Sequence, residues 1–249
     1  MQDITAQVVT LGGLVNQILD QSLQAVENYD PALCELVIAS DEHIDALRAE
    51  IEQKTFRVLT LQQPLVGTDV CFLSSVSSII GDLERIGDNA AGIAKLLLRM
   101  APLHGKAGHI GGRKTQTHTD DKRAQNAYHT VTETSIIEGL LFLGKDAQRV
   151  LQATMKAFET KDAQAARRIW QEDDVVDVRY HMVRHEVMSL FSGWHALPAL
   201  EHDTLILQRV TYWLWMAHNL ERAGDHCTNI CKRIVFILQG DTTITPRHE

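Results

Sequence analysis

The stretches DLERIGDNAAGIAK (82–95) and NLERAGDHCTNICK (219–232) decide how this chain folds. They are identical at seven of 14 positions, at an offset of 137 residues. A stretch that returns at a long offset indicates that one structural unit occurs twice in the chain. Apolar residues in both copies recur at helical spacing, so each copy is predicted to belong to an α-helix.

A second match extends the repeat toward the N-terminus. Apolar or small residues recur there in alternating steps of four and three, which places them on one helix face: Ile4, Val8, Leu11, Val15, Ile18, Ser22 and Ala25. At an offset of 132 the series returns as Ile136, Leu140, Leu143, Ala147, Val150, Thr154 and Ala157. The five extra residues fit between Phe191 and Asp203, where Gly193 and Pro198 interrupt the pattern. The sequence therefore predicts a tandem duplication.

Each half is predicted to contain three long helices, which gives an all-α fold of two three-helix bundles. The expected helices cover 3–28, 31–62 and 69–100 in the first half, and 126–160, 162–192 and 203–239 in the second. Asp30 is expected to cap the second helix, with Pro31 in its first turn, and Gly240 to end the last helix. The predicted divisions are a first repeat at 1–100, a Gly-, His- and Lys/Arg-rich linker at 101–125, a second repeat at 126–240 and a tail at 241–249.

Composition excludes several classes of protein. Of the 249 residues 45% are hydrophobic, which excludes a disordered chain, and 6% are aromatic, fewer than a β-sandwich favours. The net charge of −8 argues against nucleic-acid binding. No apolar run reaches about 18 residues, so no transmembrane segment is expected. With no secretion signal at the N-terminus and no Cys-x-x-Cys pair among four cysteines, we expect a cytoplasmic protein with reduced thiols.

Four pairs of acidic residues stand four positions apart: Asp41/Asp45, Glu84/Asp88, Asp173/Asp177 and Glu221/Asp225. Each pair shares a helix face, where like charges cost about 0.2–0.5 kcal/mol. All four flank the apolar seam at equivalent places in the two repeats. If the second and third helices are neighbours, the carboxylates converge into an oxygen-rich site suited to Mg²⁺, Mn²⁺ or Fe³⁺. The alternative is a solvated flank with ion pairs to Arg48, Arg85, Arg179 and Arg222.

Several other residues allow two interpretations. His181, His185 and His218 could bring imidazole to the second carboxylate cluster and favour Zn²⁺ or Fe²⁺, or could be ordinary surface residues. Gly87 and Gly224 lie on the seam and predict close helix–helix approach. Cys227 and Cys231 are expected to pack in the core rather than bind metal. The linker is a solvated connection or a basic contact to an acidic partner or lipid headgroup. All four tryptophans lie in the second repeat, for core packing or an asymmetric apolar contact surface.

No catalytic constellation is recognisable in the sequence. Phosphate-binding glycine loops, nucleophile elbows and dinucleotide-binding turns are all missing. A metal-dependent phosphatase that uses the carboxylates would need a base or nucleophile beside them, and none is apparent. We therefore expect a protein without enzymatic activity.

LERIGD, LERAGD, the paired acidic motifs and an upstream QQP (62–64) together resemble the PhoU family of regulators of phosphate uptake and signalling. The resemblance covers essentially the whole chain. It implies two three-helix bundles side by side and no enzymatic activity. It also implies surface metal sites, holding Fe, Zn, Mn or Mg, at Asp41, Asp45, Glu84, Asp88, Asp173, Asp177, Glu221 and Asp225.

The same resemblance implies negative control of the Pho regulon and tuning of phosphate import. The implied partners are the ATPase subunit of the phosphate ABC transporter and the PAS region of a membrane sensor histidine kinase, and we expect a homodimer. Two alternatives stay open: an accessory of a low-affinity phosphate/cation symporter, or a metal-binding regulator unrelated to phosphate. The chain departs from the family where Asp69–Cys71 lacks the usual arginine after QQP, and where Gly92 replaces an asparagine that Asn229 keeps.

Overall fold

The structure is a computed structural model that describes residues 1–61, 64–65, 67–104, 133–171, 174–192 and 200–240. These residues form helices and short connections, with no strand among them. The helices are α1 (Gln2–Asn28), α2 (Pro31–Leu61), α3 (Gly67–His104), α4 (Glu133–Thr160), α5 (Ala163–Gln171), α6 (Asp174–Ser192) and α7 (Leu200–Gln239). The predicted all-α class is confirmed.

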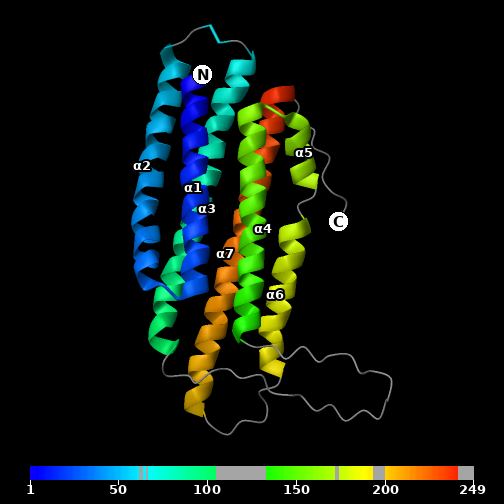
Figure 1. Cartoon of the computed structure of the whole chain (residues 1–249). Coiled ribbons are helices and arrows are strands. Elements are labelled where there is room, and N and C mark those ends of the chain that lie inside the picture. The colour runs from blue at the N-terminus through cyan, green and yellow to red at the C-terminus, as the bar shows by residue number, and fades with distance from the viewer. Residues whose placement is uncertain (62–63, 66, 105–132, 172–173, 193–199, 241–249) are drawn as a thin grey trace, which may run out of the picture.

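Two bundles lie side by side along their long axes (Figure 1). The first consists of α1, α2 and α3, and the second of α4, α5, α6 and α7. They meet where α1 packs on α4 and α3 packs on α7. The predicted duplication of a three-helix unit is confirmed by this arrangement.

The boundaries correct the sequence prediction at one place. The helix expected over 162–192 is described as α5 and α6, and residues 172–173 between them lie outside the described residues. The second begins at Asp174 and carries acidic residues in its first turn, where the helix dipole favours negative charge. Residues 101–104, expected in the linker, continue α3 instead. The expected stretches 105–132 and 241–249, and Asp173, lie outside the described residues.

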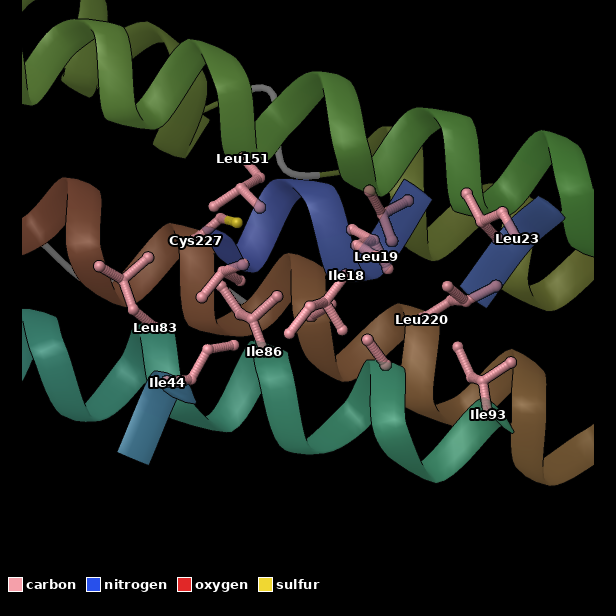
Figure 2. Packing of buried hydrophobic residues seen from close by; sticks show 14 of the residues in the cluster. Ile18, Leu19, Leu23, Ile44, Leu83, Ile86, Ile93, Leu151, Leu220 and Cys227 are labelled. Carbon is pink, nitrogen blue, oxygen red and sulfur yellow. The ribbon is translucent and has the colours of Figure 1, made fainter. Parts of the chain in front are cut away.

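The predicted apolar seams form the core. Every seam residue of α1 is buried, and in α4 all are buried except the half-buried Val150. In Figure 2, Ile18 of α1, Ile86 of α3 and Cys227 of α7 meet between the bundles. Cys227 and Cys231 are both buried and unbridged, as core packing requires.

Glycines permit the close helix approach that their seam positions predicted. A Cβ on Gly87 of α3 would lie 2.8 Å from Cδ1 of Ile44 in α2. A Cβ on Gly224 of α7 would lie 3.0 Å from Cγ1 of Val176 in α6. A larger residue at Gly87 would therefore displace the end of the Ile44 side chain, and one at Gly224 would require Val176 to shift by a few tenths of an ångström.

The interface between α1 and α4 is reciprocal. Gly12 of α1 receives Met155 of α4, and Gly144 of α4 receives Leu23 of α1. At the repeat offset of 132, Gly12 corresponds to Gly144 and Leu23 to Met155. The two repeats therefore meet through equivalent surfaces, as the subunits of a two-fold symmetric dimer do.

Polar contacts at this interface obey the same symmetry. The Gln148 amide donates to Asp20 at 3.2 Å, and the Gln152 amide donates to Asn16 at 3.1 Å. The offset of 132 converts one pair into the other. This reciprocity independently supports the alignment of the two repeats.

The same alignment appears at the ends of α1 and α4. Tyr29 and Lys161, which correspond at the offset of 132, both adopt left-handed backbone conformations, with φ of 51° and 54°. Asp30 then accepts hydrogen bonds from the backbone N–H groups of Ala32 and Leu33 at 3.0 and 3.1 Å, which confirms the predicted cap of α2. Asp162 caps α5 in the same way.

Candidate functional site

The four acidic residues of the first repeat lie on two helices that pack against each other. Asp41 and Asp45 come from α2, and Glu84 and Asp88 from α3. The pKa of Asp41 is raised, first by burial and then by Asp88, with Asp45 and Glu84 adding to the effect and Lys95 opposing it. Four carboxylates thus lie within electrostatic reach of one another.

Backbone proximity explains why Asp41 lies within reach of Asp88. Asp41 Oδ1 lies 3.5 Å from the position that a Cβ on Gly87 would occupy. The close approach of α2 to α3 at Gly87 therefore carries Asp41 toward the acidic face of α3. The glycine of the LERIGD motif thus contributes to the packing and to the site.

Arginines partly neutralise the first cluster. Arg48 Nε lies 3.5 Å from Glu84 Oε2, and Arg85 donates a hydrogen bond of 3.3 Å to Asp88. These are two of the ion pairs that the solvated-flank alternative predicted. In the described part of the chain no three His, Cys, Asp or Glu side chains are grouped so that they could hold a metal ion. The metal site remains a prediction.

The second cluster is arranged differently. Glu221 accepts a hydrogen bond of 2.9 Å from His218 Nδ1. Asp177 and Asp225 belong to the described residues, but Asp173 does not. His181 and His185 are exposed, as the surface interpretation predicted.

The ion pair that the structure describes for Arg179 lies outside the acidic cluster. It joins Arg179 to Asp146 of α4, whose side chain is 1% exposed, and Arg149 pairs with the same carboxylate. The residues that correspond to Asp146 and Arg179 in the first repeat are Leu14 and Leu47. Sequence reasoning missed this buried ion pair, although comparing the repeats at an offset of 132 would have revealed it.

A second buried charge stabilises the junction of the two bundles. Arg209 of α7 is 1% exposed and pairs with Glu133 of α4. The Tyr29 hydroxyl, from the turn after α1, donates to the same carboxylate at 3.1 Å. Burial raises the pKa of Tyr29, so its hydroxyl stays a donor at neutral pH. This contact was not predicted from the sequence, because its partners lie far apart in the chain.

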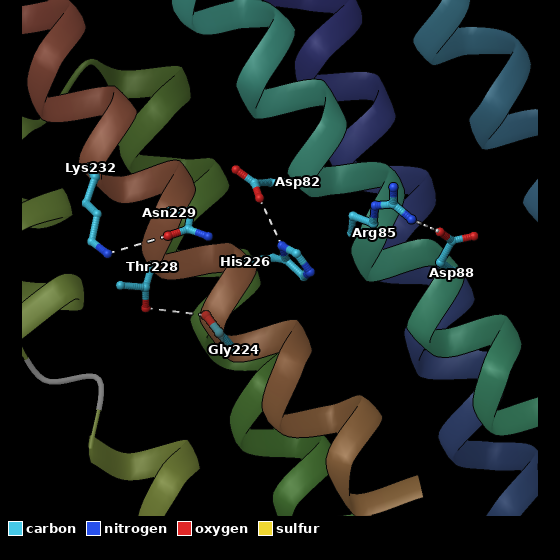
Figure 3. Close-up of polar contacts among 8 residues, drawn as sticks. All are labelled: Asp82, Arg85, Asp88, Gly224, His226, Thr228, Asn229 and Lys232. Carbon is cyan, nitrogen blue, oxygen red and sulfur yellow. Dashed lines mark hydrogen bonds and ion pairs between the residues drawn. The ribbon is translucent and has the colours of Figure 1, made fainter. Parts of the chain in front are cut away.

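A polar groove runs along the contact between α3 and α7 (Figure 3). At its centre, His226 Nδ1 of α7 donates a hydrogen bond of 2.9 Å to Asp82 of α3. The groove encloses about 770 Å³. Lys232 and Asn229 of α7 line one part of it, and Arg85 of α3 lines another.

An apolar row occupies the outer face of α6. Val175, Val178 and Met182 are 51%, 50% and 58% exposed. Their spacing of three and four residues places them on one face of the helix. The corresponding first-repeat residues are His43 and Glu50, with Ala46 between them. Only the second repeat therefore presents large apolar side chains here.

The PhoU domain model matches residues 8–97 and 140–234, once in each repeat. The chain belongs to the PhoU family. The two matched ranges contain the residues of both acidic clusters and most of the residues that line the groove between α3 and α7. The family resemblance drawn from the LERIGD and LERAGD motifs is confirmed.

Relatives and solved structures agree with this assignment. The chain is 30% identical to a phosphate-specific transport system accessory protein PhoU homolog of Caulobacter vibrioides, over 98% of this chain and 90% of that protein. It is 27% identical to the PhoU accessory protein of Escherichia coli, over 96% and 84%.

A crystal structure of the phosphate transport system regulatory protein PhoU from Streptococcus pneumoniae superposes with a TM-score of 0.74 at 26% identity, over 97% of this chain and 96% of that one. PhoU from Pseudomonas aeruginosa, at 23% identity, shares the fold with a TM-score of 0.75, over 96% and 97%. In the part of the chain that the structure describes, no helix has the length and apolar character needed to cross a membrane.

Proposed function

We propose that this chain regulates phosphate uptake and phosphate signalling by docking on a component of a phosphate transport system at the cytoplasmic face of the membrane. Family membership supports the phosphate role, since the relatives are named as accessory proteins of phosphate-specific transport. The role is that of a binding protein rather than an enzyme. In more detail, the chain exerts negative control of the Pho regulon and contacts the transporter ATPase and a sensor kinase.

The observation that carries the docking proposal is the apolar row of α6. Single exposed apolar side chains are common on protein surfaces, but a contiguous row on one helix face is typical of an interaction surface. Val175, Val178 and Met182 form such a row, and the equivalent face of the first repeat does not. The row therefore supports a partner that contacts the second repeat. We propose the transporter ATPase as this partner, with the sensor kinase and a second copy of the chain as further binders.

The test uses a strain that lacks this chain and is complemented with variants. The α6 variant combines Val175→Ser, Val178→Ser and Met182→Gln. With this variant we expect phosphate uptake and a phosphate-responsive reporter to be as deregulated as in the strain that lacks the chain. The matched control changes the equivalent face, His43→Ser with Glu50→Gln, and is expected to restore regulation. Full regulation by the α6 variant would refute the docking surface.

The runner-up function, an accessory of a low-affinity phosphate/cation symporter, is distinguished by the same strains. Uptake is measured with and without the phosphate ABC transporter. If our proposal is correct, the effect of this chain on uptake disappears when the ABC transporter is removed. An effect of unchanged size would instead support the symporter.

We also propose that the first acidic cluster binds a divalent cation. The donor chemistry suits Mg²⁺ or Mn²⁺, because the Asp41 carboxylate is within electrostatic reach of Asp45, Glu84 and Asp88. Binding would require these side chains to move closer together, since they are not grouped around a metal position in the structure. Binding of the cation would require the ion pairs of Arg48 with Glu84 and of Arg85 with Asp88 to break. We expect Mg²⁺ or Mn²⁺ to raise the melting temperature of the wild type but not of Asp41→Asn with Asp88→Asn. An equal rise in both proteins would contradict the site, and elemental analysis of protein purified without an affinity tag would identify the metal.

A further inference from the structure

We propose that the groove between α3 and α7 binds a small anion that carries a phosphate group. The groove is lined by cationic and hydrogen-bond-donating side chains from α2, α3 and α7. Its ligand would not contact the apolar row of α6, so the proposal adds a ligand site that is separate from the docking surface. The groove shares Arg48, Glu84 and Arg85 with the acidic cluster or its ion pairs.

Cations outnumber carboxylates in the groove. Arg48, Arg85, Lys232 and Arg233 line it, and the carboxylates of Asp82 and Glu84 are the acidic groups in its lining. Arg48 and Arg85 also form ion pairs with Glu52 and Asp88 beside the groove, so the positive charge that remains uncompensated is that of Lys232 and Arg233. Such a concave, positively charged site concentrates anions.

Both carboxylates already have partners within the groove. Asp82 accepts the hydrogen bond from His226 at 2.9 Å, and Glu84 lies 3.5 Å from Arg48 Nε. Lys232 and Arg233, by contrast, have no carboxylate within ion-pairing distance among the described residues. Lys232 instead donates a hydrogen bond of 3.5 Å to Asn229 (Figure 3). Lys232 Nζ also lies 6.0 Å from the centre of the Trp170 ring. Neither cation is neutralised by a carboxylate of the described residues, so both can contribute charge to an incoming anion.

Unused hydrogen-bond donors strengthen the case. Arg48 Nε is buried and makes no hydrogen bond, although its charge is paired with Glu84 at 3.5 Å. An acceptor within hydrogen-bond distance would satisfy this donor. The Ser77 and Ser78 hydroxyls also line the groove and make no hydrogen bond within the described part of the chain. Guanidinium, ammonium and hydroxyl groups together are the donors that bind phosphate oxygens.

The second repeat provides an internal comparison. At the offset of 137, Ser77 and Ser78 correspond to Leu214 and Trp215, and Arg233 corresponds to Leu96. The equivalent place on the other side of the pseudo-two-fold axis is therefore apolar where this one is polar. Duplication of the fold does not by itself produce the groove chemistry, so these side chains are particular to one copy.

The size of the groove admits more than one source of the phosphate group. Its volume of about 770 Å³ falls within the range of roughly 300–1,000 Å³ that ligand pockets occupy. It therefore accommodates inorganic phosphate or a larger phosphate ester such as a nucleotide. The two share the same chemistry at the cations and differ in what fills the remaining space.

Titration calorimetry on the purified full chain tests the proposal. The probes are inorganic phosphate, ATP and, as a control anion at matched ionic strength, acetate. We expect saturable binding of phosphate or ATP and none of acetate. Tight binding of ATP alone would assign the groove to a phosphate ester, and comparable binding of both would assign it to the phosphate group itself. If the heat of binding saturates with neither phosphate nor ATP, the proposal is overturned. The groove would then be a contact for something else, such as an acidic protein segment.

Matched variants locate the binding. Lys232→Gln with Arg233→Gln is expected to weaken binding at least tenfold, since each lost charge-assisted hydrogen bond contributes about 1.5–3 kcal/mol. The milder Ser77→Ala with Ser78→Ala is expected to weaken it several-fold without affecting folding. Lys95→Gln, at the repeat-equivalent of Lys232, and the α6 variant are expected to bind normally. Equal affinity in all variants would refute the site, and it would leave the α6 docking proposal untouched.

Discussion

Replacing Arg179 by leucine tests the buried ion pair of the second repeat. In the folded protein the Asp146 carboxylate is 1% exposed and is neutralised by Arg179 and Arg149. Arg149 is 72% exposed and its pairing is weakened by solvent, so Arg179 is the stronger partner. Arg179→Leu would leave Asp146 buried with only the solvent-exposed arginine.

The magnitude follows from these exposures. Removing one partner of a fully buried pair costs about 3–5 kcal/mol. Arg179 is itself 37% exposed and Arg149 remains, so we expect a loss near the value of a charged hydrogen bond, about 1.5–3 kcal/mol. Changing Arg149 to Gln, its first-repeat counterpart, is expected to cost less than about 1 kcal/mol.

The double variant Asp146→Leu with Arg179→Leu restores the residues of the first repeat, where Leu14 and Leu47 occupy these positions. It removes the stranded charge and buries apolar surface instead, so we expect it to recover most of the lost stability. Urea denaturation of the wild type, of Asp146→Leu, of Arg179→Leu and of the double variant gives the coupling energy between the two residues. A coupling below about 0.5 kcal/mol, with Arg179→Leu as stable as the wild type, would refute the reasoning.

Two further predictions concern the first repeat. Because burial and Asp88 raise the pKa of Asp41 above its unfolded value, the folded state holds the proton more tightly, and the free energy of unfolding should rise as the pH falls toward that pKa. Asp41→Asn should flatten this pH dependence and stabilise the chain at pH 7 by about 0.5 kcal/mol, measured by urea denaturation across pH. A loss of stability in this variant would contradict the prediction. Asp30→Ala removes the cap of α2 and should cost about 1 kcal/mol in the same assay, with Asp30→Asn, which can still cap, close to the wild type; equal stabilities of the two variants would argue against capping.

The fold could be predicted from the sequence because its determinants are local and repeated. The seam of α1, the DLERIGD and NLERAGD helices and the cap at Asp30 each depend on residues within a few turns of one another. The end of α3 could not be predicted in the same way, because the composition of residues 101–104 indicated a linker although they continue the helix.

Contacts in the candidate sites could be predicted from the sequence where they depend on local spacing, but not where they depend on helix packing. The proximity of Asp41 to Asp88 followed from spacing, since both lie on helices joined by a short connection. The pairing of Asp146 with Arg179, and of His226 with Asp82, joins residues whose encounter depends on how helices pack. Helical periodicity indicates which face of a helix is buried, but it does not identify which residue of a neighbouring helix a given side chain will contact.

Binding between the purified chain and the phosphate transporter ATPase tests the central claim most directly. The measurement compares the wild type, the α6 variant with Val175→Ser, Val178→Ser and Met182→Gln, and the control with His43→Ser and Glu50→Gln, each confirmed as helical by circular dichroism. Our account predicts that the wild type and the control bind with similar affinity and that the α6 variant binds at least tenfold more weakly. Equal binding by all three, or no binding by the wild type, would contradict it.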